Sequence, residues 1–246
     1  MTKAKPKISK EQMERHNQFM LYLHDEHACP TAREWVKKNK HDIFTAWENC
    51  PESNWMSWLM DCMTDTSANG RSRQCFPSYT TIVRRCVMVA DEAFKKSTEL
   101  RLPKNEKLRE YIRKGIRFFR TLVGGKNELK KLREYRKELK EKMKLKEKMK
   151  PLSSDLEGDV FEIRCLGILK DLSYTVGAFV EERERKKKVP LYLYNMAGDA
   201  EEVSERIEVL FQEKGLASKI FRRIAPLNVK ACNYFLSHRK KGEMTW

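Results

Sequence analysis

The stretch YTTIVRRCVMVADEAF, residues 79–94, sets the fold class of this chain. Its apolar side chains recur with the spacing of one continuous helix face. They are Tyr79, Ile82, Val83, Cys86, Val87, Ala90 and Phe94. The pattern predicts a helix over about 78–99 that packs this face against other helices.

The helical period continues toward the N-terminus. A residue suited to cap a helix precedes each of four further segments: Ser9, Thr31, Asp42 and Ser53. Ser or Thr followed three positions later by Gln or Glu, as at Ser9 and Thr31, forms a capping box. We expect one helix that ends near Glu26, followed by three short ones.

The same period continues toward the C-terminus. Residues 104–123 predict an amphipathic helix that ends at Gly124 and Gly125. We further expect a long helix carrying Phe161 to Val180, a helix that Asp199 caps and Gly215 ends, and a last helix carrying Leu227 to Phe235. Residues 189–194 form either a short strand or an extended connector. The expected fold class is all-α, a multi-helix orthogonal array or bundle with one long Lys/Glu-rich helix.

Four of the five tryptophans fall within 24 residues, in the short N-terminal helices. They are Trp35, Trp47, Trp55 and Trp58. Such a cluster suits the stacking of single-stranded bases. Short capped helices also need large apolar anchors, and we favour a role in the core beneath helices 78–99 and 104–123.

Composition limits the function classes. The chain has 246 residues, 51 Lys or Arg and 35 Asp or Glu, and a net charge of +16. Its longest uncharged stretches are ten residues each, whereas a membrane span needs roughly 20. No apolar region follows the basic N-terminus, so we expect no signal peptide. Seven cysteines, without any C-x-x-C, are typical of reduced thiols in a cytoplasmic protein of a bacterium or an infected host cell; disulfide pairing after export is the less favoured alternative.

Most of the net charge lies in one fifth of the chain. Residues 104–150 hold 19 Lys or Arg and 7 Glu, which gives +12. Within this region, residues 126–150 have a high helix propensity, and the expected helix has only a narrow apolar seam. Lys140, Lys144 and Lys148 fall on one ridge of this helix, and Lys142, Lys146 and Lys150 on another. Like charges four positions apart weaken a helix, and a polyanion along the ridge relieves that repulsion.

The segment predicts contact with nucleic acid or another polyanion through its basic residues. The candidates are Arg109, Arg113, Arg117, Arg120, Lys130, Lys131, Arg133, Arg136, Lys137, Lys140, Lys144 and Lys148. Such residues bind the phosphate backbone without reading bases. A solvated helix face or a coiled-coil seam is the alternative interpretation. We expect three regions: a Trp/Cys-containing helical domain over 1–125, a basic helix or linker over 126–150, and a C-terminal helical domain over 151–246.

Signals for catalysis and metal binding are weak. His24, His27 and Cys29 lie close in sequence, and Cys50, Cys62 or His41 would complete a tetrahedral site, but the spacing matches no standard zinc pattern. No glycine-rich phosphate loop or nucleophile elbow occurs. We therefore expect no enzyme, no metal and no cofactor, with a metal-dependent nuclease built from scattered carboxylates as a minor alternative.

The Trp/Cys region resembles a known module. ACPTAREWV (28–36), AWENC (46–50) and NWMSWL (54–59) are similar to the pattern A-C-x-x-A-x-x-W, A-W-x-x-C, D-W-x-x-W-L. This pattern occurs in the helical immunity-protein (Imm5-like) family of polymorphic toxin systems and prophages. The resemblance covers about residues 20–120, and Asn54 stands where the family has an acid. It implies an all-α, intracellular, phage- or mobile-element-associated protein that works by binding, and it assigns no catalytic residue.

Two functions follow as hypotheses. The first is a non-enzymatic binding protein that contacts nucleic acid through its basic helices. The second is an immunity or inhibitor protein that binds an acidic toxin or a host defence protein. We expect no membrane partner, and a homo-oligomer through the long helix is compatible with either function.

Overall fold

The computed structural model describes residues 9–64, 75–101, 106–125, 128–148, 156–185 and 196–237. Within these ranges the chain forms eleven helices and no strand, so the prediction of an all-α multi-helix fold is confirmed. The helices are α1 Lys10–Asp25, α2 Pro30–Asn39, α3 Ile43–Asn49, α4 Ser53–Thr64, α5 Tyr79–Arg101, α6 Glu106–Val123, α7 Leu129–Lys148, α8 Leu156–Arg185, α9 Met196–Phe211, α10 Leu216–Ile224 and α11 Val229–Ser237.

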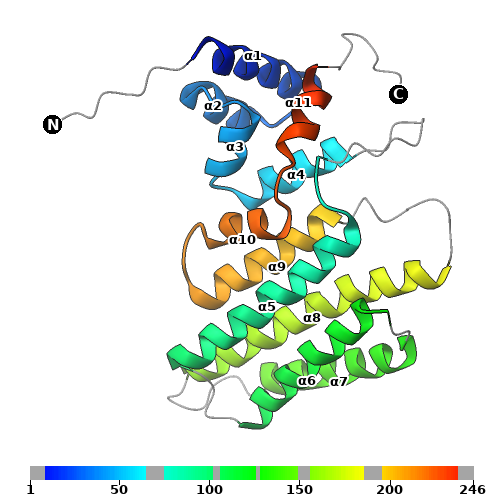
Figure 1. The fold of residues 1–246 in the computed structure, drawn as a ribbon. Coiled ribbons are helices and arrows are strands. Elements are labelled where there is room, and N and C mark those ends of the chain that lie inside the picture. Colours follow the sequence, from blue (N-terminus) through cyan, green and yellow to red (C-terminus); the bar gives the residue numbers. More distant parts are fainter. Residues whose placement is uncertain are drawn as a thin grey trace.

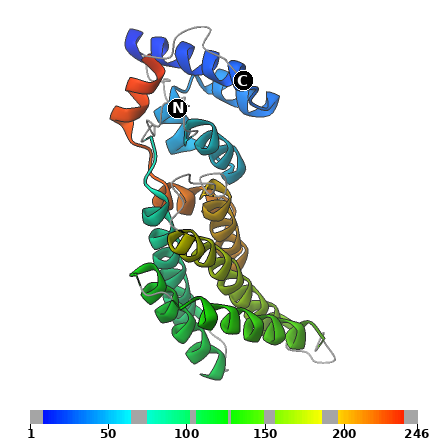
Figure 2. The ribbon, with the colours of Figure 1, turned by 90° about the vertical axis from the view of Figure 1, so that its right-hand side faces the viewer.

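The molecule is elongated. Helices α1 to α4 and α11 lie at one end, α5, α8, α9 and α10 occupy the middle, and α6 and α7 lie at the other end (Figures 1 and 2). The long helix α8 contacts α5, α6, α7 and α9. The first and last helices, α1 and α11, contact each other. The basic helix α7 therefore packs on the body through α8.

One hydrophobic cluster runs through these layers, from Phe19 in α1 to Cys232 in α11. Trp47 of α3 is 2% exposed, and its ring contacts Phe76 and Phe221 with centroids 4.9 and 5.8 Å away. The other three clustered tryptophans are partly buried and pack against the same core. The interpretation of the tryptophans as core residues is therefore confirmed, most fully at Trp47. Their predicted position beneath helices 78–99 and 104–123 is wrong for the second of these helices, because α6 lies at the other end of the molecule from α1 to α4 (Figure 1).

Local capping chemistry places several helix starts where the sequence predicts them. The backbone N–H of Gln12 donates to Ser9 Oγ at 3.1 Å, and that of Thr45 donates to Asp42 Oδ1 at 2.9 Å. Gly125, with φ of 119°, follows the end of α6 in a conformation that suits glycine. These boundaries depend on neighbouring residues alone, so the sequence reveals them.

Four boundary predictions are wrong. Ser53 is the first residue of α4 and not its cap, and its Oγ donates to Glu205 of α9 at 3.2 Å. Helix α2 begins at Pro30 with Cys29 as its cap, because proline is preorganised for the first helical position, and Thr31 lies inside the helix. Helix α9 begins at Met196, which places Asp199 in its first turn. The sequence also misses α10 as a separate helix: Gly215 caps it without a side chain, and Glu208 of α9 accepts from the N–H of Ala217 at 2.7 Å instead.

Three arginines join helices by donating to backbone carbonyls near helix ends, which have no partner within their own helix. Arg85 donates to Ile224 O at 3.2 Å, and Arg183 to Leu122 O at 3.1 Å. Arg222 donates to the carbonyls of Trp47 and Cys50, each at 3.2 Å. Part of the positive charge is thus used inside the fold.

The predicted division near residues 150–155 lies outside the described residues, as does the segment 189–194. On either side of that division, helices pack together directly. Helix α9 contacts α4 and α5, and α8 contacts α5 and α6. The predicted domains 1–125 and 151–246 therefore share a core.

None of the described helices combines the length and the hydropathy that a bilayer crossing requires. All seven cysteines carry free thiols, and five of them are buried. Burial raises the pKa of the Cys50 thiol to about 11 and that of Cys165 to about 12. These thiols therefore serve as small apolar core residues.

Candidate polyanion-binding surface

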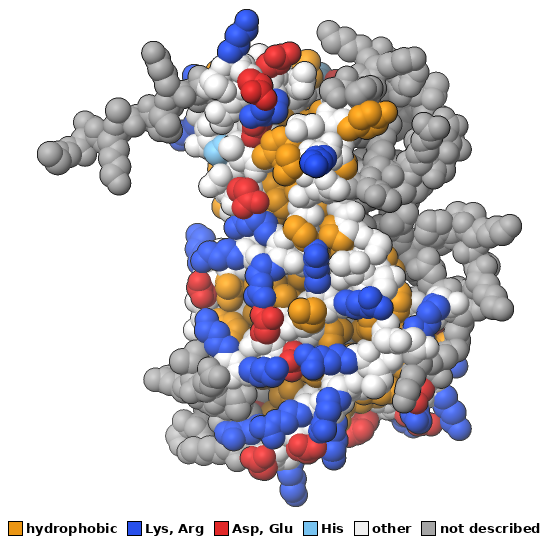
Figure 3. Space-filling view, viewed as in Figure 1, with side chains coloured by type: hydrophobic (Ala, Val, Ile, Leu, Met, Phe, Trp, Pro, Cys, Tyr) orange, Lys and Arg blue, Asp and Glu red, His pale blue; other side chains and the backbone are white. Residues whose placement is uncertain are grey.

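The predicted basic residues divide into two groups on different sides of the molecule. Positively charged side chains crowd the face of α5, α6 and α10, with fewer acidic ones among them (Figure 3). The arginines of α6 lie along its border with α5. Most of the basic residues of α7 lie elsewhere, as the contacts of that helix show.

The orientation of α7 follows from its buried side chains. Leu132 and Leu139 are buried, and the ring of Tyr135 stacks on Tyr111 of α6 with centroids 5.5 Å apart. Lys142 Nζ lies 4.7 Å from the centre of the same Tyr111 ring. Lys142 therefore lies on the α6 side of α7, where it is 41% exposed and also pairs with Glu138 at 3.4 Å.

Five basic residues follow one line along the opposite, exposed side of α7. At about 100° per residue, they fall within a sector of about 80° and span about 21 Å. We call them the α7 stripe: Lys130, Arg133, Lys137, Lys140 and Lys144. Glu134, Glu138 and Glu141 lie between this stripe and the side of α7 that contacts α6.

The α7 stripe is weakly neutralised. Lys144 Nζ lies 3.4 Å from Glu141. The other four members form no ion pair with another residue in the described ranges. All five are exposed. The stripe is therefore a line of positive charge open to solvent.

The remaining predicted α7 residues are placed differently. Arg136 is half-buried and donates to Ser173 O at 2.7 Å, while its guanidinium lies 4.8 Å from the centre of the Tyr174 ring. Burial lowers the pKa of Arg136, and Gly177 of α8 leaves the space that its guanidinium occupies. Arg136 thus joins α7 to α8. Lys131 pairs with Glu128 at 3.2 Å, and the side chains of Lys146, Lys148 and Lys150 lie outside the described residues.

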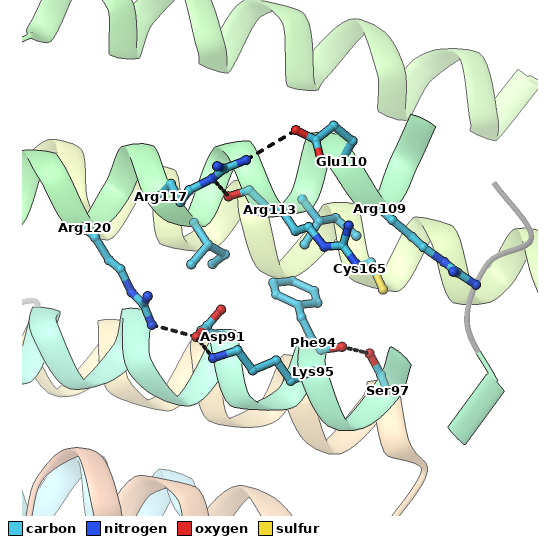
Figure 4. A pocket seen from close by; sticks show the side chains of 12 residues that line it. Asp91, Phe94, Lys95, Ser97, Arg109, Glu110, Arg113, Arg117, Arg120 and Cys165 are labelled. Atoms are coloured by element: carbon cyan, nitrogen blue, oxygen red, sulfur yellow. Dashed lines mark hydrogen bonds and ion pairs between the residues drawn. The ribbon is translucent and has the colours of Figure 1, made fainter. Parts of the chain in front are cut away.

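All four predicted arginines of α6 line a groove of about 650 Å³ between α5 and α6. They are Arg109, Arg113, Arg117 and Arg120, and α5 contributes Lys95. The apolar lining comes from Phe94, Ile112 and Ile116, with Cys165 of α8. We call this site the α5–α6 groove (Figure 4).

Acidic residues neutralise much of the groove's charge. Asp91 Oδ2 accepts from Arg120 at 2.6 Å and lies 2.8 Å from Lys95 Nζ. Arg117 turns toward Glu110, which it reaches at 3.3 Å (Figure 4). Arg113 lies 3.9 Å from Glu106, whose side chain is 74% exposed, so its guanidinium is the least constrained of these.

Sequence reasoning missed the α5 side of this groove. Phe94 falls on the predicted core face, and the sequence pattern predicts no role for Asp91 or Lys95. The only sequence signal was the spacing of Asp91 and Lys95, which places an acid and a base on neighbouring turns. Their position opposite α6 depends on how the two helices pack.

The metal-ligand candidates suggested by the sequence do not form a cluster in the described residues. Cys29 is exposed, Cys50 is buried, and His24 is 75% exposed beside Asp25. Among the residues that the structure describes, no three His, Cys, Asp or Glu side chains form a group that would hold a metal ion.

Asp199 of α9, which the sequence predicts only as a helix cap, is a partly buried carboxylate. Tyr79 Oη donates to Asp199 Oδ2 at 3.0 Å and lies 3.3 Å from Thr175 O. Burial, with a further contribution from nearby Glu202, raises the pKa of Asp199 to about 7, although the bond from Tyr79 lowers it. Burial and Glu201 likewise raise the pKa of Asp61 to about 6.

Asp199→Asn is expected to raise the free energy of unfolding by about 2 kcal/mol at about pH 8. The folded state binds this proton more tightly than the unfolded state, so the stabilising contribution is full below about pH 4 and is lost as the pH rises through about 7. Urea denaturation of wild type and variant across this range gives the difference. If the free energies of unfolding of wild type and variant differ by the same amount at every pH, the raised pKa of Asp199 in the folded state is contradicted.

A scan against family models, a search of curated proteins and a search of solved structures found no match for this chain. The resemblance to the immunity-protein family therefore stays a prediction.

Proposed function

We propose that this chain is a non-enzymatic helical protein that binds nucleic acid through the α7 stripe. The observation that carries the proposal is the line of five exposed cations, four of them without an ion pair in the described ranges. The arginines of α6 are left out of this contact set because they line the α5–α6 groove and do not share the exposed side of α7. Arg136 is left out because it donates to Ser173 O of α8.

The charge arrangement favours a polyanion. Neighbouring members of the α7 stripe repel one another at three- and four-residue spacing, which costs a few tenths of a kcal/mol for each pair. Phosphates along the stripe neutralise this charge and release counterions. Four of the five members are lysines, whose charge suits the phosphate backbone, so we expect a contact that tolerates any sequence.

The test is a titration of a labelled duplex and a labelled single strand at 50 and 200 mM salt. Five phosphate contacts give a slope of about −4.5 in log K against log salt for a duplex, which is roughly a 500-fold loss of affinity over this range. A salt-independent affinity would contradict the proposal.

Charge removal locates the contact. The variant Arg133→Gln/Lys137→Gln/Lys140→Gln keeps good helix formers and is expected to lower the slope by about 2.7. The matched control, Lys37→Gln/Lys38→Gln/Lys230→Gln, removes the same charge from exposed positions on α2 and α11. It is expected to leave the slope almost unchanged. Equal losses in both variants would mean that net charge alone drives binding.

The alternative is binding to an acidic toxin or host defence protein through the same stripe. If the protein does not bind nucleic acid at 50 mM salt, an acidic protein becomes the favoured partner.

We further propose a cytoplasmic location, which the free cysteines support, and an association with phages or mobile elements, which rests on the resemblance alone. Sedimentation of the purified chain tests a homo-oligomer through α7.

A further inference from the structure

The α5–α6 groove is bounded at one end. Arg120 of α6 reaches across it to Asp91 of α5, which also holds Lys95 (Figure 4). From this bridge the groove runs along α6 to Arg113 and Arg109, about 16 Å at 1.5 Å per residue. Its volume of about 650 Å³ lies in the range of small-molecule sites.

The lining is apolar at the floor and basic at the rim. Phe94 and Ile112 are each 6% exposed and Ile116 is 2% exposed, so packing holds these side chains in place and leaves only their edges open to the groove. Arg113 is 57% exposed and lies 3.9 Å from Glu106, a distance beyond a hydrogen bond. A guanidinium in this state is suited to a bidentate contact with a carboxylate or a phosphate.

We propose that the α5–α6 groove binds a small amphipathic anion, with its acidic group on Arg113 and its apolar body on Phe94, Ile112 and Ile116. Arg109, one turn before Arg113, adds positive charge at the same end. The occupant class follows from charge complementarity at one end of the groove and apolar surface along the rest.

The bridge at Asp91 favours a small molecule over a nucleic-acid strand. A strand that runs along the groove would have to break the contacts of Asp91 with Arg120 and Lys95. A short chain anchored at Arg113 ends before this bridge. The groove lies on the α5 side of α6, away from the α7 stripe, so this proposal does not rest on nucleic-acid binding.

Calorimetric titration with decyl phosphate, decanoate and inorganic phosphate tests the apolar contribution, with circular dichroism to follow the fold. We expect one decyl phosphate or decanoate per chain, and binding of inorganic phosphate at least 100-fold weaker. Within a series of shorter chains, affinity is expected to rise about two- to fourfold with each methylene until the groove is filled.

Arg113→Gln tests the anchor. We expect at least a tenfold loss of decyl phosphate affinity, because a charge-assisted contact is removed. The matched control is Lys114→Gln, one position along α6, since Lys114 is 69% exposed and does not line the groove. The control is expected to keep the wild-type affinity.

Three results would overturn the proposal. They are no binding of either decyl ligand, equal affinity for inorganic phosphate, and equal losses in Arg113→Gln and Lys114→Gln. Duplex titration of Arg113→Gln separates the two proposals. An unchanged salt slope with lost decyl phosphate binding supports a separate ligand site, whereas a duplex loss as large as that of the α7 triple variant would make the groove part of the nucleic-acid surface.

Discussion

Trp47→Ala is expected to lower the free energy of unfolding by about 3–5 kcal/mol. Trp47 is 2% exposed, and its ring contacts Phe76 before α5 and Phe221 in α10. Removal of the indole leaves a cavity where α3, α10 and the start of α5 meet. Those elements are distant in sequence and rigidly packed, so the cavity does not collapse completely.

Urea denaturation followed by far-UV circular dichroism measures this loss, since the signal does not depend on the tryptophan itself. Trp58→Ala is the comparison, because Trp58 is only partly buried and is expected to cost less. Trp47→Phe keeps part of the apolar volume, so it gives a measurable transition even where the alanine variant does not fold. Equal losses of stability in Trp47→Ala and Trp58→Ala would contradict the expectation that the more buried tryptophan contributes more.

Gly115→Ala is expected to destabilise the protein by about 1–3 kcal/mol, although alanine is the better helix former. A Cβ at position 115 would meet the hydroxyl of Tyr135, and its ring carbon Cζ at 3.1 Å. The Tyr135 ring has little room to move, because it packs against Tyr111, Phe118 and Phe119. The added methyl group therefore pushes α7 away from α6.

Two controls separate this contact from general helix effects. Gly167→Ala in α8 brings a Cβ only to 3.8 Å from Arg206, and is expected to be neutral or stabilising by up to about 1 kcal/mol. Tyr135→Phe removes the hydroxyl that the new methyl group meets. In a double-mutant cycle, Gly115→Ala is expected to cost less in the Tyr135→Phe background, with a coupling of about 1 kcal/mol. If the effects of Gly115→Ala and Tyr135→Phe simply add, the destabilisation by Gly115→Ala does not arise from contact with the Tyr135 hydroxyl.

Helix positions were readable from the sequence where neighbouring residues set them. Ser9 and Asp42 cap helices through their own side chains, and the face that begins at Tyr79 repeats with the period of a helix. Helix α10 was not readable as a separate element, because Glu208 of another helix accepts from the N–H of Ala217 in its first turn. The same limit applies to the bond from Tyr79 to Asp199, which joins residues 120 positions apart.

The sequence by itself determined the all-α class, the helix faces and the concentration of charge in residues 104–150, because the helical period fixes which residues share a face. Only the tertiary structure decided which charges stay exposed. Tyr135 against Gly115, and Arg136 against Gly177, set the rotation of α7 and turn the α7 stripe toward solvent. The packing of α6 on α5 turned its arginines into the rim of a groove. Both outcomes depend on contacts between helices, which no single helix encodes.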